Sequence, residues 1–143
     1  MADLDLVRRL GAAEHGLAVV ATTRADGTVQ ASLVNAGVMP APSGDGEVVA
    51  FVARGNAIKL RHLRARPRAA IVFRSGWEWA SVEGPATIVG PDDRADPERL
   101  RVLLRDVFSA AGGTHDDWDE YDRVMREERR TVVLVTPERV SGN

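Results

Sequence analysis

The sequence predicts a mainly β protein, built as an antiparallel sheet or barrel with short helices at its ends. Several short runs of apolar and β-branched residues are joined by turn sequences typical of hairpins, one short helical segment interrupts them, and two helical segments come late in the chain. The length of 143 residues, with 44% hydrophobic and 28% charged residues, is typical of one globular domain, which we expect to span residues 1–143.

Six segments have the residue pattern of strands. Each is a short apolar run that ends at a turn rich in glycine or proline. Asp26-Gly27 is a hairpin turn between the first two strands, and Ser75-Gly76 separates the fourth from the fifth. On the fifth strand, Trp77 and Trp79 would point to the same side. The predicted strands are 17–23, 28–39, 47–53, 68–73, 77–89 and 131–135, and we expect only a tail at 137–143.

Four segments have apolar residues at helical spacing, and recognisable cap residues precede them. Asp3 would cap the first helix, and Asp96 followed by Pro97 would begin the third. Thr114 with Asp117 three residues later resembles a capping box at the fourth. The predicted helices are 3–15, 56–65, 96–110 and 114–128.

Several classes of protein are excluded by what the sequence lacks. There is no cysteine, which removes disulfides, thiolate metal sites and cysteine nucleophiles. No stretch matches a nucleotide-binding glycine loop or a serine nucleophile elbow. His115-Asp116-Asp117 is interpreted as the solvated first turn of a helix, so no metal is expected. Without an apolar run of about 20 residues or a signal peptide, we expect a cytoplasmic protein with no membrane partner.

The basic residues are concentrated in one segment, although the net charge is −2. A local positive patch of this kind suits an anionic small molecule or a polyanion, and the alternative is a solvated, arginine-rich helix face. His62 lies in the same segment and would face solvent or a ligand. Because aromatic residues are not interleaved, no nucleic acid is expected. The basic residues between positions 48 and 77 are Arg54, Lys59, Arg61, Arg64, Arg66, Arg68 and Arg74.

Lys59 is the only lysine, and its position breaks a local rule. If Asn56 caps the short helix, Lys59 lies in the first turn, where a cation opposes the helix dipole. The same position is favourable when a phosphate binds the free N–H groups at the helix N-terminus. Gly55 before the helix would let such a ligand approach the backbone closely.

Three stretches and the chain end carry a family resemblance. Residues 17–27, 49–70 and 76–84, with His115 to Tyr121 and Arg129-Arg130 near the end, resemble the split-barrel flavin and deazaflavin oxidoreductases, the superfamily that includes pyridoxamine 5'-phosphate oxidase. The resemblance is greatest to its actinobacterial branch, which uses the deazaflavin coenzyme F420. It implies a six-stranded antiparallel split β-barrel that forms a homodimer with two cofactor sites at the interface.

The resemblance also implies which residues bind the cofactor. Lys59 would bind its phosphate, the strand that ends at Arg54 would run along it, and the second strand would supply polar contacts near the ring. Trp77 would come from the other subunit. No side chain is assigned a catalytic role, because the cofactor carries the chemistry. The implied cofactor-binding residues are Gln30, Ser32, Val52, Ala53, Arg54, Asn56, Ala57, Ile58, Lys59 and Trp77.

Departures from the family pattern favour the deazaflavin. Members that bind flavin mononucleotide (FMN) usually have Thr-Asn at the end of the third strand and Ser two residues before the lysine, where this chain has Ala53-Arg54 and Ala57.

The implied function is an F420-dependent oxidoreductase that transfers a hydride between the cofactor and a small electron-poor organic substrate. The alternatives are an FMN-dependent oxidoreductase and a non-catalytic protein that binds a cofactor or a tetrapyrrole.

Overall fold

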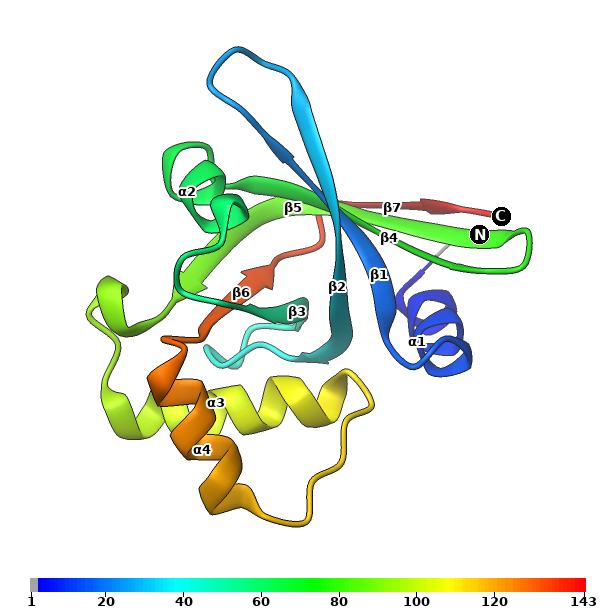
Figure 1. Ribbon diagram of the computed structural model, residues 1–143. Coiled ribbons are helices and arrows are strands. Elements are labelled where there is room, and N and C mark those ends of the chain that lie inside the picture. The colour runs from blue at the N-terminus through cyan, green and yellow to red at the C-terminus, as the bar shows by residue number, and fades with distance from the viewer. Residues whose placement is uncertain (1–2) are drawn as a thin grey trace.

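The chain forms seven strands, four α-helices and one 3-10 helix within residues 3–143, the part that this computed structural model describes (Figure 1). The strands are β1 (Leu17–Thr23), β2 (Val29–Pro40), β3 (Glu47–Ala53), β4 (Arg68–Ser75), β5 (Glu78–Val89), β6 (Thr131–Val135) and β7 (Arg139–Gly142). The helices are α1 (Leu4–Ala13), α2 (Ile58–Ala65), η1 (Pro91–Asp93), α3 (Pro97–Ala110) and α4 (Trp118–Glu127).

Six strands close into an antiparallel barrel. They pair in the order β4-β1-β2-β3-β6-β5, and β5 pairs with β4 to close the ring. The two longest strands change partner along their length: β2 pairs first with β1 and then with β3, and β5 pairs first with β4 and then with β6. The predicted six-stranded antiparallel split barrel is therefore confirmed, with β7 as an extra strand beside β5.

Strand alternation separates the core from the surface. On β1, Ala18 and Val20 are buried inside the barrel, whereas Leu17 and Val19 point outward and are exposed. A second apolar cluster lies between α3 and the outer face of β2, β3 and β6. Because β6 lies between the two clusters, all five of its residues are buried.

Two expectations about strands are wrong. Residues 137–143 are not only a tail, because Ala80 to Glu83 of β5 pair with β7. Trp77 is not on a strand: it follows Gly76, whose φ is +60°, in the β4–β5 turn, and it is 95% exposed. Alternation along β5 therefore does not place Trp77 beside Trp79.

The helix caps are partly as predicted. Asp3 and Asp96 each accept a backbone hydrogen bond at the start of α1 and α3, as expected. The cap of α4 is Asp117 and not Thr114, so His115 lies before the helix and packs against the aromatic rings of α3 and α4. None of the helices in the described residues is long and apolar enough to cross a bilayer.

Candidate functional site

The turn between β3 and α2 builds the candidate site. Ala53 ends β3, and the Ala57 N–H donates to the Arg54 carbonyl oxygen at 3.0 Å, which turns the chain into α2. Ala57 is the N-cap of this helix and makes no side-chain capping bond, so the prediction that Asn56 caps it is wrong. The N-terminal N–H groups of α2 are consequently not occupied by a side-chain cap, and free groups of this kind attract anions.

Lys59 is the second residue of α2 and is half-buried. Among residues 3–143 its ammonium group has no ion-pair partner, and burial lowers the pKa of Lys59 below the ordinary value for lysine. Burial and the helix dipole both disfavour the charged form, and a bound anion would offset both effects. These surroundings are typical of a lysine whose ammonium group binds an anionic ligand.

The predicted basic patch is largely dispersed by pairing within the chain. Of the seven basic residues, only Lys59 and Arg61 have no ion pair or side-chain hydrogen bond within residues 3–143, and Arg54 lies 3.5 Å from Glu128. Nothing in the sequence indicated Glu128, because the contact joins segments more than seventy residues apart. The other four are bound to Asp93 (Arg64), the Thr23 carbonyl (Arg66), Glu138 (Arg68) and the Gly76 carbonyl (Arg74).

A buried polar cluster lies beneath α2. The Thr22 hydroxyl lies 2.9 Å from Nδ1 of His62, which is buried, so of the two alternatives for His62 the solvent-facing one is wrong. Gln30 is the cross-strand partner of Thr22 and shares its face of the sheet, and Ser32 lies two residues further along. The Gln30 Oε1 atom is buried and has no hydrogen-bond partner among the described residues. An unsatisfied buried acceptor costs about 1–3 kcal/mol, so this atom marks a place for a donor.

The remaining predicted residues are distributed over different faces. The side chain of Ala53 belongs to the barrel core, whereas Val52 packs outward against the second apolar cluster. Ile58 is 43% exposed at the start of α2. Trp77 is far from this site within one chain. The strand β4, which has eight residues and is roughly 26 Å long, runs from the end of α2 to the β4–β5 turn that contains Trp77 (Figure 1).

Comparisons with known proteins agree with this architecture. The family model described as pyridoxamine 5'-phosphate oxidase matches residues 7–143. A solved protein of unknown function from Agrobacterium tumefaciens is 18% identical with a TM-score of 0.64, and the match covers 99% of this chain but 57% of that chain. An F420 reductase is 21% identical with a TM-score of 0.60, with 87% of this chain and 88% of that chain covered.

A pyridoxamine 5'-phosphate oxidase-related, FMN-binding protein from Nostoc punctiforme is 14% identical with a TM-score of 0.61, and the match covers 96% of this chain and 79% of that chain. Identities this low show a shared fold and do not distinguish one cofactor from another. The family model, by contrast, spans nearly the whole chain. The chain therefore belongs to the pyridoxamine 5'-phosphate oxidase family.

Proposed function

We propose that this protein is an F420-dependent oxidoreductase that transfers a hydride between the deazaflavin and a small electron-poor organic substrate. The observation that carries the proposal is the start of α2, where a helix without a side-chain cap presents a half-buried lysine that has no ion pair in residues 3–143. This arrangement suits a phosphate group, which both flavin and deazaflavin cofactors contain.

The polar cluster beneath α2 supports the same ligand class. The buried Gln30 Oε1 atom needs a donor, and the ring N–H of a flavin or deazaflavin is a donor of that kind. Ser32, on the same face of β2, adds a hydroxyl group. We therefore assign Gln30 and Ser32 to the ring and Lys59 to the phosphate.

The residues around Lys59 favour the deazaflavin over FMN. Ala57, the N-cap of α2, lacks the hydroxyl group that would hydrogen-bond a phosphate monoester. Arg61 is exposed in the first turn of α2, and Arg54, which is 63% exposed, could exchange its 3.5 Å contact with Glu128 for one with a ligand. The deazaflavin carries a phosphodiester and an oligoglutamate tail, and its negative charge extends over the longer path that spread-out arginines suit.

The bound deazaflavin would supply the hydride, and the protein residues would bind and orient it. We further propose that the working unit is a homodimer, because Trp77 is fully exposed and far from α2 of its own chain. A second copy would bring its Trp77 to the site. The outer face of the β1–β2–β4–β5 region offers a surface for that contact, with exposed apolar side chains at Leu17, Val19, Val29, Leu33 and Trp79.

A side-by-side titration with oxidised F420 and with FMN, read by tryptophan quenching, tests the proposed function. We expect micromolar or tighter binding of the deazaflavin and much weaker binding of FMN. Protein loaded with reduced F420 should then regain the absorbance of the oxidised deazaflavin only when an electron-poor acceptor, such as a quinone, is added, because the hydride passes to the acceptor. Preference for FMN, or binding of neither compound, would contradict the proposal.

A further inference from the structure

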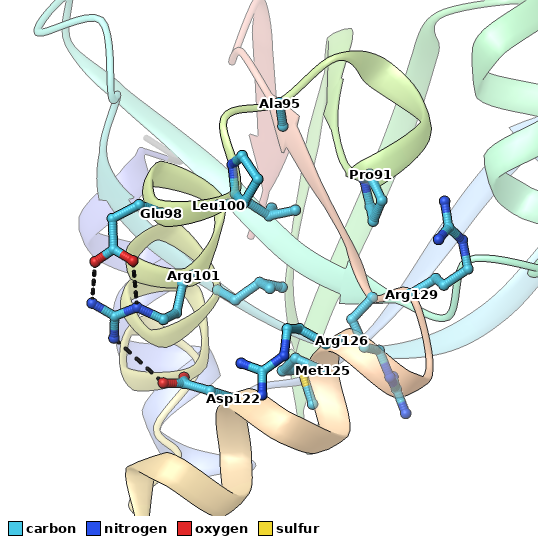
Figure 2. Close-up of a pocket in the computed structure, with 12 residues that line it drawn as sticks. Pro91, Ala95, Glu98, Leu100, Arg101, Asp122, Met125, Arg126 and Arg129 are labelled. Carbon is cyan, nitrogen blue, oxygen red and sulfur yellow. Dashed lines mark hydrogen bonds and ion pairs between the residues drawn. The ribbon is translucent and has the colours of Figure 1, made fainter.

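A cavity of about 560 Å³ lies between η1, α3 and α4, on the outside of the barrel (Figure 2). Its volume falls within the range of about 300–1,000 Å³ that is usual for small-molecule sites. None of the residues assigned to the cofactor lines it. The lining residues belong to 91–104 and 122–130, and the second segment adjoins the proposed cofactor site, because Glu128 pairs with Arg54 and Arg129 lies against Gly55.

One wall of the cavity is apolar. Leu100 and Leu104 project from α3, and Met125 projects from α4. Pro91, Ala95 and Pro97 extend this surface toward the mouth, where both prolines are exposed. An apolar wall of this kind favours a ligand with a hydrocarbon or ring body.

The two acids of the cavity are already neutralised by arginines. Asp122 is 7% exposed and accepts hydrogen bonds from Arg105 at 2.9 Å and from Arg101 at 3.3 Å. Glu98 accepts from the Nε of the same Arg101 at 3.0 Å, as the dashed lines in Figure 2 show. The carboxylates therefore do not repel an anion as isolated charges would.

The positive charge that remains without an ion pair within residues 3–143 is that of Arg126, which is exposed at the mouth of the cavity. Arg129 follows α4 with φ +50°, a left-handed position where glycine is usual, and it pairs with Asp92. A Cβ at position 55 would lie 2.8 Å from the Arg129 Cβ, which is too close. The absence of a side chain at Gly55 therefore leaves room for Arg129. A side chain kept in a disfavoured backbone conformation is a candidate for a functional role.

We propose that this cavity is a second ligand site, distinct from the cofactor site, that takes an amphipathic monocarboxylate. The apolar body packs against Leu100, Leu104 and Met125, and the carboxylate binds Arg126 at the mouth, beside the Arg129–Asp92 ion pair. Arginine suits this role because its guanidinium group forms paired hydrogen bonds with a carboxylate. The inference goes beyond the proposed function and does not depend on which cofactor the protein uses.

The three methionines allow a direct test by NMR of protein labelled with ¹³C at the methionine methyl groups. Met125 lines this cavity, whereas Met39 lines a neighbouring groove between β2, β3 and α3, which shares Ala95, Glu98 and Leu100 with the cavity, and reports on apolar binding beyond it. Decanoate, kept below its micelle-forming concentration, is the probe. We expect the Met125 resonance to shift and saturate while the Met39 resonance does not, and decanol to bind at least about ten-fold more weakly than decanoate.

Matched variants on α4 test the charge. Arg126→Gln should weaken decanoate binding about ten-fold, whereas Arg123→Gln, on the same helix but paired with Glu127 and outside the cavity, should leave it unchanged. Equal effects of the two variants, or parallel shifts of Met39 and Met125, would overturn the proposal. Displacement of decanoate by F420 would overturn it as well, by assigning the cavity to the cofactor. Failure of F420 to bind at all would contradict only the proposed function.

Discussion

A cation in the first turn of a helix lies at the positive end of the helix dipole, and burial adds to the cost of its charge. Lys59 combines both conditions: it is the second residue of α2, it is half-buried, and its pKa is lowered by burial. A phosphate at the same turn would relieve both costs. Cofactor affinity should therefore depend on Lys59 far more than stability does.

We expect Lys59→Ala to weaken cofactor binding by about 1.5–3 kcal/mol, the usual range for a hydrogen bond to a charged group. The melting temperature of the free protein should stay close to that of the wild type, because no ion pair in residues 3–143 is lost. The measurement is the titration by tryptophan quenching together with thermal unfolding. Arg123→Ala, at the far helix α4, is the control, and unchanged affinity in Lys59→Ala would remove the phosphate role.

At this scale the sequence predicted what depends on neighbours along the chain. The short helix and the place of Lys59 in its first turn follow from local spacing. The polar cluster of Thr22, Gln30 and His62 was not predicted as a unit, because it depends on the register between β1 and β2 and on where α2 packs. Gln30 itself was identified only through the family resemblance.

Among the elements, α4 is held to the molecule mainly by side chains. The Tyr121 hydroxyl donates to the Leu104 carbonyl at 2.9 Å, and Asp122 accepts from Arg101 and Arg105 of α3. The Arg105 guanidinium, with that of Arg101, holds the pKa of Asp122 below its usual range. A carboxyl group with a lower pKa in the folded state adds stability at neutral pH.

Asp122→Asn should lower the free energy of unfolding at pH 7 by about 1–3 kcal/mol, because it removes the charge and replaces one accepting oxygen by an amide nitrogen that cannot accept from the arginines. The contribution of Asp122 is fully present above the unfolded pKa of about 4 and is lost as the pH falls through the lower folded pKa. Urea unfolding of both proteins between pH 7 and about pH 2.5 should show the difference closing in acid. A difference that stays constant would mean that hydrogen bonding, and not charge, holds α4.

Elements with local signatures were the predictable ones. The caps Asp3 and Asp96 give α1 and α3 their starts, and the hairpin turn at Asp26-Gly27 joins β1 to β2. In contrast, β7 has four residues and exists because β5 offers it an edge to pair with, which no local pattern reports. Trp77 lies in the β4–β5 turn because Ser75 pairs with Glu78, and this strand pairing, which no local pattern reports, fixes where the turn lies.

In the whole molecule, the barrel leaves an apolar surface on one side. Local patterns predicted a sheet or a barrel, and the closed six-stranded form followed only from the family resemblance. The exposed apolar side chains on β1, β2 and β5 alternate with core residues along each strand. Alternation points them all to the outside of the barrel, and together they form this apolar surface. Contiguous exposed apolar surface of this kind usually marks an interface.

This apolar face is the proposed dimer contact. Leu33 is 64% exposed at its centre, opposite Val19 on the neighbouring strand, so Leu33→Glu would place a charge in the proposed dimer contact. We expect the wild type to sediment as a dimer and Leu33→Glu as a folded monomer with weakened cofactor binding, because each site then loses the Trp77 of the other copy. Val102→Glu, at an equally apolar but distant position on α3 that is 43% exposed, should remain a dimer. A wild type that is monomeric over the micromolar range and still binds the cofactor tightly would contradict the shared site. Trp77→Ala separates the two effects, since it should lower cofactor affinity while the dimer persists.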